Sequence, residues 1–452
     1  MLPLFGGREM DKRACIRVTP PGPNAKRIVD RDTRYLATAT KAAPVVALRA
    51  RGALVEDVDG NTFLDFTSGV GVVNTGHCHP AVVAAVQKQA AELMHFAGTD
   101  FYYDIQVRLA EKLARITPGK YDKKVFYTNS GAESVEAAIK LARWSSGRKQ
   151  FVGFIGAFHG RTMGALSLTA SKPVHKDRFF PTMPGVEHIP FAYCYRCPYK
   201  LEYPGCGVWC ARILEELYFS SFLPPDEVAA IFMEPIQGEG GYIVPPPEWA
   251  REMREIASRH GILLVDDEVQ AGFGRTGKWF AIQHYGVTPD IICLAKGMGS
   301  GLPIGAIVYD ARLDYTVKGA HSNTYGGNLL GCAASLAGIE VLDKEKLVQN
   351  AARTGDYLHK RLLELQGRHE CIGDVRGKGL MQATEFVLDR RTKKAAPKLR
   401  DDIEEIAFKN GLMLLGCGRS SMRYIPPLIV TKDQIDQAMD ILDKAIGEAE
   451  KL

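Results

Sequence analysis

The sequence lacks an apolar run of the roughly 18 residues that a membrane-spanning helix needs. Its net charge of +5 is small for 452 residues, and its lysines and arginines are dispersed, so we predict no nucleic-acid surface. The first residues place charges after a very short apolar segment, which is the wrong order and length for a signal peptide. We therefore expect a cytoplasmic protein with neither a membrane nor a nucleic-acid partner.

The cysteine framework of a small secreted protein is also missing. Six of the ten cysteines are scattered along the chain, as expected of buried thiols. The other four, Cys194, Cys197, Cys206 and Cys210, have the spacing C-x₂-C-x₈-C-x₃-C, which resembles that of a small zinc knuckle. They lie in a loop rich in tyrosine, proline and glycine. We expect structural thiols or disulfides there, with metal binding as the alternative, and we assign no metal ligand.

Repeats and low-complexity tracts are absent, and short apolar runs alternate with helical periodicity from about residue 80. The runs cover residues 125–128, 151–155, 228–233, 262–265 and 290–295. Continuous aliphatic runs separated by helices are typical of a parallel sheet covered on both faces. The pattern predicts an α/β fold whose large domain, residues 76–340, has a mainly parallel sheet.

The two ends of the chain have a different pattern. An alternating stretch around Asp59-Gly60 predicts a hairpin. The last helix is predicted to begin with a capping box formed by Thr431 and Gln434. We predict that residues 1–75 and 341–452 together build a smaller α+β domain.

Polar residues that follow the apolar runs are candidates for a binding site, because ligands of open parallel sheets bind beyond the carboxyl ends of the strands. One run ends at Thr128, and the turn through Ser130 and Gly131 leads into a helix. A glycine permits close backbone approach, and free N–H groups at a helix start favour an anion such as phosphate. An ordinary Ser-Gly helix cap is the alternative. The loop does not have the P-loop pattern.

Two further runs end in charged residues. Asp266, Asp267 and Glu268 follow one run, where a carboxylate can face a cationic ligand or a metal, or simply cap a strand. Lys296 follows another, and burial would make its amine a nucleophile toward carbonyls, whereas a surface lysine is the ordinary alternative. The glycines after Lys296 would leave room for a planar ligand. Together, a phosphate anchor, a carboxylate for a ring nitrogen and a nucleophilic lysine match the needs of pyridoxal 5′-phosphate (PLP).

Seven motifs in order strengthen this interpretation: "TNSGAESVEAAIKLAR", "GAFHGRTMGALSLT", "MEPIQGEGG", "DDEVQAGFGRTG", "LAKGMGSGLPIGA", "NTYGGN" and "MRYIPPL". The sequence resembles the class III (ω-amino acid) aminotransferases of PLP-dependent fold type I, the aspartate-aminotransferase-like fold. This group includes 4-aminobutyrate, ornithine and acetylornithine aminotransferases. The resemblance extends from about residue 45 to near the C-terminus, and it implies an enzyme acting on small amino and keto acids.

The resemblance implies two catalytic residues, Lys296 as the Schiff-base lysine and proton shuttle and Asp267 as the partner of the ring nitrogen. It also implies a set of cofactor contacts: Ser130, Gly131 and Ala132 at the phosphate, Phe158 and Val269 on the two ring faces, Gln270 at the 3-hydroxyl, and His159 in support. Thr324 would reach the cofactor phosphate of a partner subunit, which implies a homodimer or higher oligomer with shared active sites. Glu234 is expected to be a scaffold carboxylate near Gln270.

Substrate residues also follow from the resemblance. Arg423 would bind a substrate carboxylate through two parallel hydrogen bonds, unless it forms only a structural salt bridge. Glu239 would pair with Arg423 and open or close according to the substrate. Val70 occupies a position that is often Tyr in ornithine-type members and aliphatic in 4-aminobutyrate-type members.

The implied reaction moves an amino group from a 4-aminobutyrate- or ornithine-like ω-amino acid to a 2-oxo acid such as 2-oxoglutarate, by a ping-pong mechanism. The alternative is a PLP-dependent amino-acid racemase or epimerase of the same family. Such relatives tend to carry Asp where Glu239 stands, so the glutamate favours transamination.

Overall fold

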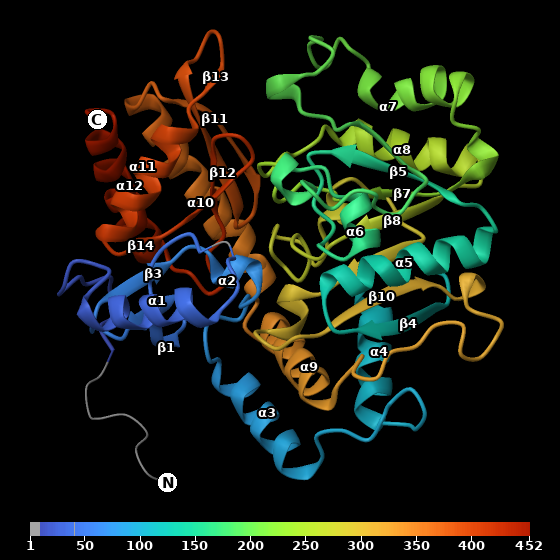
Figure 1. The fold of residues 1–452 in the computed structure, drawn as a ribbon, viewed down its shortest axis with the longest axis horizontal. Helices are drawn as coiled ribbons and strands as arrows, with labels where there is room; N and C mark the ends of the chain where they lie inside the picture. Colours follow the sequence, from blue (N-terminus) through green and yellow to red (C-terminus); the bar gives the residue numbers. More distant parts are fainter. Residues whose placement is uncertain (1–9, 40) are drawn as a thin grey trace.

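The computed structural model describes residues 10–39 and 41–452, and its centre is a seven-stranded sheet (Figure 1). The strand order is β4-β10-β9-β8-β7-β5-β6. The strands are β4 (Lys123–Thr128), β5 (Gln150–Ile155), β6 (Val186–Pro190), β7 (Val228–Met233), β8 (Leu263–Asp267), β9 (Ile291–Leu294) and β10 (Gly305–Asp310). Only β10 runs antiparallel to its neighbours in this sheet. The prediction of a mainly parallel sheet is confirmed.

Helices cover both faces of this sheet. The helices α4 (Asp104–Ile116), α5 (Gly131–Ser146), α6 (Met163–Leu168) and α8 (Pro247–Arg259) pack on its strands. Further out, α9 (Leu329–Lys344) packs on α4, α3 (Pro80–Glu92) on α9, and α7 (Trp209–Ile213) on α8. Successive residues of β9 belong to different apolar clusters: Cys293 packs with residues of α5, whereas Leu294 belongs to the cluster that contains Trp249 of α8. Because successive strand residues point to opposite faces, a fully apolar strand requires this two-sided cover.

The N-terminal elements are α1 (Pro23–Tyr35), β1 (Ala47–Arg51), β2 (Leu54–Asp57), β3 (Thr62–Asp65) and the short α2 (Ser68–Gly71). Strands β2 and β3 pair antiparallel around Asp59-Gly60, and Gly60 has the positive φ of +83° that the turn requires. The hairpin prediction is therefore confirmed. β3 also pairs in parallel with β14 (Leu412–Met413), so the two ends of the chain share a sheet (Figure 1).

The C-terminal part contains a third sheet and three helices. Its elements are α10 (Leu347–Arg368), β11 (Ile372–Lys378), β12 (Met381–Asp389), β13 (Lys394–Ala395), α11 (Pro397–Lys409), β15 (Leu415–Cys417), β16 (Ser421–Tyr424) and α12 (Lys432–Ala449). α12 begins with the expected capping box of Thr431 and Gln434. The domain boundaries at residues 75 and 340 remain a prediction.

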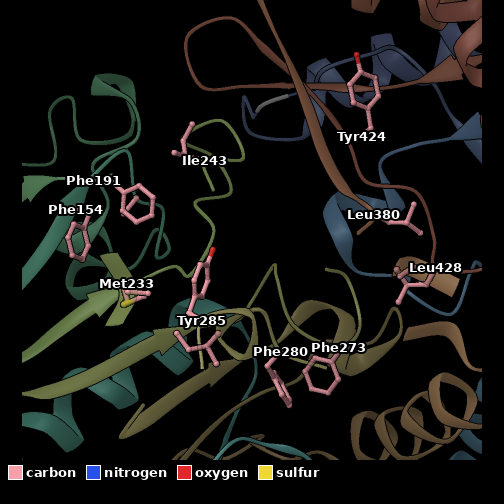
Figure 2. Close-up of a cluster of buried hydrophobic side chains, with 14 of the residues drawn as sticks. Phe154, Phe191, Met233, Ile243, Phe273, Phe280, Tyr285, Leu380, Tyr424 and Leu428 are labelled. Carbon is pink, nitrogen blue, oxygen red and sulfur yellow. The ribbon is translucent and has the colours of Figure 1, made fainter. Parts of the chain in front are cut away.

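One apolar cluster connects the central sheet with the C-terminal part. Figure 2 shows its members, from Phe154 and Met233 on the central strands to Leu380 and Leu428 of the C-terminal part. Tyr285 lies among them, and its hydroxyl donates to the Pro235 carbonyl at 2.9 Å. The buried cluster fixes the C-terminal part against the carboxyl ends of the strands, which positions the site described below.

The short apolar segment at the start of the chain, which we do not expect to be a signal peptide, falls on residues 1–9. It lies outside the described residues. Across residues 10–39 and 41–452, no helix is long and apolar enough to cross a membrane.

Candidate active site

Lys296 lies directly beyond β9 and begins a short 3₁₀ turn that ends at Gly299. Its φ of +44° is uncommon for a residue with a side chain, and such backbone strain concentrates at functional sites. Burial lowers the pKa of Lys296, although the negative charges of Asp267 and Glu234 oppose this effect. A lowered pKa leaves more of the amine neutral, which is the form that attacks a carbonyl.

Two of the glycines that follow Lys296, Gly297 and Gly299, lie against side chains of the protein. A Cβ added at Gly297 would lie 2.5 Å from the Asn74 Nδ2, and one added at Gly299 would lie 3.0 Å from a methyl of Ile304. Asn74 in turn donates to a backbone carbonyl and accepts from Arg275 at 2.7 Å. These two glycines therefore admit neighbouring protein side chains, and the expectation that the glycines after Lys296 leave room for a planar ligand stays a prediction.

Asp267 ends β8 and is held by two hydrogen bonds. Its Oδ2 lies 2.7 Å from the Nδ1 of His159, and its Oδ1 accepts from the backbone N–H of Val269 at 3.0 Å. Both side chains are buried. Burial alone would lower the pKa of His159, but the hydrogen bond and charge of Asp267 raise it. The pair fixes one carboxylate in position at the end of the strand.

The two carboxylates next to Asp267 in the sequence, Asp266 and Glu268, are not paired with another predicted site residue in the described part of the chain. Asp266 is fully buried, and neither carboxylate oxygen has a hydrogen-bond partner among the described residues. Burial, aided by the charge of Glu268, raises the pKa of Asp266. Burial also raises the pKa of Glu268 to about 8, and this side chain accepts from the Ile282 N–H at 2.7 Å. Of the three acidic residues, only Asp267 is paired with another predicted site residue.

The start of α5 faces the end of β8. Ser130 is the helix N-cap and accepts from the Glu133 N–H at 3.3 Å, so it does cap the helix in the ordinary way. A Cβ added at Gly131 would lie 2.7 Å from Val269 Cγ1. The first N–H groups of a helix, here those of Gly131 and Ala132, have no intrahelical acceptor and favour an anion. Glycine at 131 therefore brings an anion-binding helix start against the strand that carries Asp267.

Glu234 connects three further segments. Its two oxygens accept from the N–H groups of Phe158 at 2.9 Å and of Gly238 at 2.8 Å. Burial raises the pKa of Glu234 to about 7. A Cβ added at Gly238 would lie 2.6 Å from the amide oxygen of Gln270 and 3.3 Å from Glu234 Oε2, so both side chains border the same glycine, as expected of a scaffold carboxylate. The amide oxygen of Gln270 is buried without a hydrogen-bond partner among the described residues.

Arg423, on β16, meets Glu239 as expected. Arg423 Nη2 lies 3.1 Å from Glu239 Oε2 and also donates to the Gly416 carbonyl at 3.1 Å. Arg423 is 7% exposed. A second cation, Lys172, donates to Glu239 Oε1 at 2.7 Å. All three side chains line a cavity of about 700 Å³. Lys172 could not be found from sequence, because a lone lysine in a loop carries no periodic or motif information about a partner 67 residues away.

Two predicted residues stand apart from these contacts. Thr324 is exposed in the segment before α9, and within the described part of the chain it forms no hydrogen bond with another predicted site residue. Val70 is also exposed, at a φ of +66° in the loop-like α2. The adjoining Gly71 faces Ile425 and Gln270, so the Val70 segment passes beside the site.

The four-cysteine loop connects β6 with α7, and Cys210 is already in that helix. Its cysteines are free thiols, and burial raises the pKa of Cys210 to about 12. Among the residues that the structure describes, no group of three metal-ligating side chains is arranged to hold a metal ion. Tyr193 and Arg196 of this loop hydrogen-bond to Glu385, which also pairs with Arg376 at 2.9 Å. The loop therefore anchors to the C-terminal sheet through charge pairs.

Comparison with known proteins agrees with this geometry. The family model for aminotransferase class-III matches residues 35–446. The chain belongs to the class-III aminotransferase family. It is similar to an acetylornithine aminotransferase of Methanosarcina mazei (39% identity, covering 92% of this chain and 96% of the relative) and to an alanine/serine racemase of Pyrococcus horikoshii (38%, 96% and 92%). An (S)-enantioselective omega-transaminase structure from Thermomicrobium roseum superposes with a TM-score of 0.88 at 32% identity, covering 94% of this chain and 99% of that one.

Membership confirms the predicted fold type, cofactor and reaction class: this is a PLP-dependent class-III aminotransferase. The residues present fit the cofactor. The start of α5 offers N–H groups to a phosphate, and the buried amide oxygen of Gln270 lacks a partner among the described residues. Asp267 ends β8, and Lys296 follows the neighbouring strand β9. When bound, PLP supplies an aldehyde for covalent linkage and a ring that accepts electrons from the substrate.

Proposed function

We propose that this aminotransferase takes its amino group from a 4-aminobutyrate- or ornithine-like ω-amino acid and transfers it to a 2-oxo acid such as 2-oxoglutarate, by a ping-pong mechanism. The observation that carries this proposal is the ion pair between Arg423 and Glu239, two side chains close enough to Lys296 for their charges to act on its pKa. A free arginine binds a carboxylate through two parallel hydrogen bonds. When Glu239 occupies that arginine, the site suits a donor with no carboxylate beside its reacting carbon.

The proposed roles of the other residues are those that the family resemblance implies, and contacts in the structure support several of them. Lys296 accepts and returns the proton at the carbon that bears the amino group, because its lowered pKa favours the neutral base. Asp267, oriented by His159, keeps the ring nitrogen protonated. The phosphate is bound by Ser130, Gly131 and Ala132, the ring faces by Phe158 and Val269, and the 3-hydroxyl by Gln270. Val70 borders the donor's distal end.

We further propose a homodimer, in which the exposed Thr324 binds the cofactor phosphate of the partner subunit, and a cytoplasmic location. Mixing two inactive variants, Thr324→Ala and Lys296→Ala, tests the shared site. Subunit exchange should create a heterodimer with one intact site and restore part of the activity. If mixing restores nothing while dimers do exchange, the shared site is refuted.

A second candidate is amino-acid racemisation or epimerisation. It is favoured by one observation: the Pyrococcus horikoshii relative named alanine/serine racemase is as similar to this chain as the aminotransferases. A racemase uses the same lysine but returns the proton to the opposite face, without a net transfer of the amino group.

One assay separates the two candidates. The purified holoenzyme is mixed with single amino acids, with and without 2-oxoglutarate, while glutamate and the enantiomeric composition are followed together, and Lys296→Ala serves as the inactive control. The proposal expects glutamate from 4-aminobutyrate or ornithine only when the acceptor is present. Inversion of an L-amino acid without acceptor, and negligible glutamate, would establish the racemase instead.

A further inference from the structure

Glu239 is bound by two cations through different oxygens. Arg423 Nη2 lies 3.1 Å from Oε2, and Lys172 Nζ donates to Oε1 at 2.7 Å. The side chain of Arg423 is 9% exposed, that of Glu239 17% and that of Lys172 34%, so the three lie in a row from the interior outward. Lys172 lies in the loop that follows α6, whereas Arg423 lies on β16 of the C-terminal sheet.

The surrounding charges keep Glu239 ionised. Burial alone would raise its pKa, but Arg423 and then Lys172 bring the pKa of Glu239 below its usual value, and His175 acts in the same direction. Arg161 is the other charged group near His175. No positive group is therefore needed from the substrate to hold this carboxylate.

The energetically costly step for such a site is the exchange in which Arg423 leaves Glu239 for a substrate carboxylate. If a substrate carboxylate takes Arg423, Glu239 loses one of its two ionic partners while it remains mostly buried. A buried carboxylate without a partner is strongly unfavourable. Lys172 already binds the other oxygen, so only one bond has to break and the anion keeps a counterion.

We propose that Lys172 is a specificity-determining positioning residue: it retains Glu239 when Glu239 leaves Arg423, and thereby admits substrates with a carboxylate beside the reacting carbon. This inference rests on the proposed function, because it concerns the same substrate site. Lys172 acts through Glu239 and does not have to touch the substrate. The effect of Lys172 is therefore confined to substrates with a carboxylate beside the reacting carbon. Donors that lack this carboxylate leave the Arg423–Glu239 ion pair intact and do not need Lys172.

The test compares Lys172→Met with the wild-type holoenzyme. We expect KM for 2-oxoglutarate to rise about tenfold, the ratio expected for one charge-assisted hydrogen bond, with kcat within twofold. KM for 4-aminobutyrate should stay within twofold. Lys172→Arg should restore KM for 2-oxoglutarate. Lys176→Met is the matched control: this lysine lies on the same segment, donates to the Ser167 carbonyl at 3.0 Å, and does not line the cavity.

A double-variant cycle distinguishes positioning from direct binding. In a Glu239→Gln background Arg423 is no longer held by a carboxylate, so adding Lys172→Met should change KM for 2-oxoglutarate by less than twofold. A tenfold effect that persists in this background would overturn the inference, since Lys172 would then bind the substrate itself. Equal rises of KM for donor and acceptor would overturn it as well.

Calorimetric titration of 2-oxoglutarate into the wild-type and Lys172→Met holoenzymes compares their Kd values for 2-oxoglutarate in the absence of turnover. A wild-type enzyme that makes no glutamate from any donor would refute the proposed function, whereas the titration would still decide the inference. An unchanged Kd in Lys172→Met would refute the role of Lys172 alone.

Discussion

Replacing Gly131 with alanine tests the contact that brings the start of α5 against β8. The added Cβ would lie 2.7 Å from Val269 Cγ1 and 3.1 Å from Val269 Cγ2, whereas carbon atoms in good contact are about 3.5–4.0 Å apart. The valine must therefore retreat by roughly 0.8 Å, and its branched Cβ leaves it few other rotamers. Because the Val269 N–H binds Asp267, a backbone shift would also disturb that carboxylate.

Such overpacking costs about 1–3 kcal/mol in well-packed sites. The cofactor-free protein can relax around the added methyl, whereas the bound ring and phosphate require both segments in place. We therefore expect PLP affinity to fall about tenfold, which corresponds to about 1.4 kcal/mol. The assay is a titration of the cofactor-free protein with PLP, followed by absorbance. Affinity within twofold of wild type, with the fold intact, would refute the reasoning.

Other substitutions test the packing and the buried charges. Gly367→Ala, in α10 with no atom within 4 Å of the added Cβ, should raise stability by about 0.5 kcal/mol and leave PLP affinity unchanged, as a control for Gly131→Ala. Glu385→Ala should lower stability by about 3 kcal/mol, because the nearly buried Arg376 loses a partner, whereas Glu340→Ala, which breaks an exposed pair, should cost less than about 1 kcal/mol. Glu234, whose pKa is raised to about 7, should make the cofactor-free protein lose stability as pH rises from about 4.5 to 7, by up to about 3 kcal/mol. Glu234→Gln should reduce the loss by this amount, whereas the raised pKa of the buried Glu268 leaves a slope of the same sign in both proteins.

A loss of PLP affinity in Gly367→Ala would contradict its use as a control. Denaturant midpoints report the stabilities. Equal losses in Glu385→Ala and Glu340→Ala would contradict the importance of burial for the charge pairs. Parallel pH profiles for wild type and Glu234→Gln would mean that burial does not raise the pKa of Glu234.

Much of the fold and site could be predicted because the determining patterns are local. The apolar runs correspond to strands, and the residues that end parallel strands must meet at one edge, which brought Asp267 and Lys296 together from positions 29 residues apart. The strand β6 and the antiparallel β10 were not among the predicted runs. β10 follows a glycine-rich turn, which obscures its start.

What escaped prediction depends on long-range partners. Lys172 has no sequence signature, and its importance lies in a contact with Glu239 that only the folded chain creates. Likewise, position 297 requires glycine because the side chain of Asn74 lies against it, and this contact between distant residues is not visible in the sequence. The anchoring of the four-cysteine loop on Glu385 joins residues almost 200 positions apart, which no local pattern encodes.

The central claim is that this enzyme transfers amino groups in two separate half-reactions. The most direct test is a single-turnover measurement: the PLP-loaded protein is mixed with 4-aminobutyrate or ornithine in the absence of any 2-oxo acid. The account expects one equivalent of carbonyl product per active site, after which the reaction stops until 2-oxoglutarate is added. Continued inversion of an amino acid with no carbonyl product and no need for an acceptor would contradict the account.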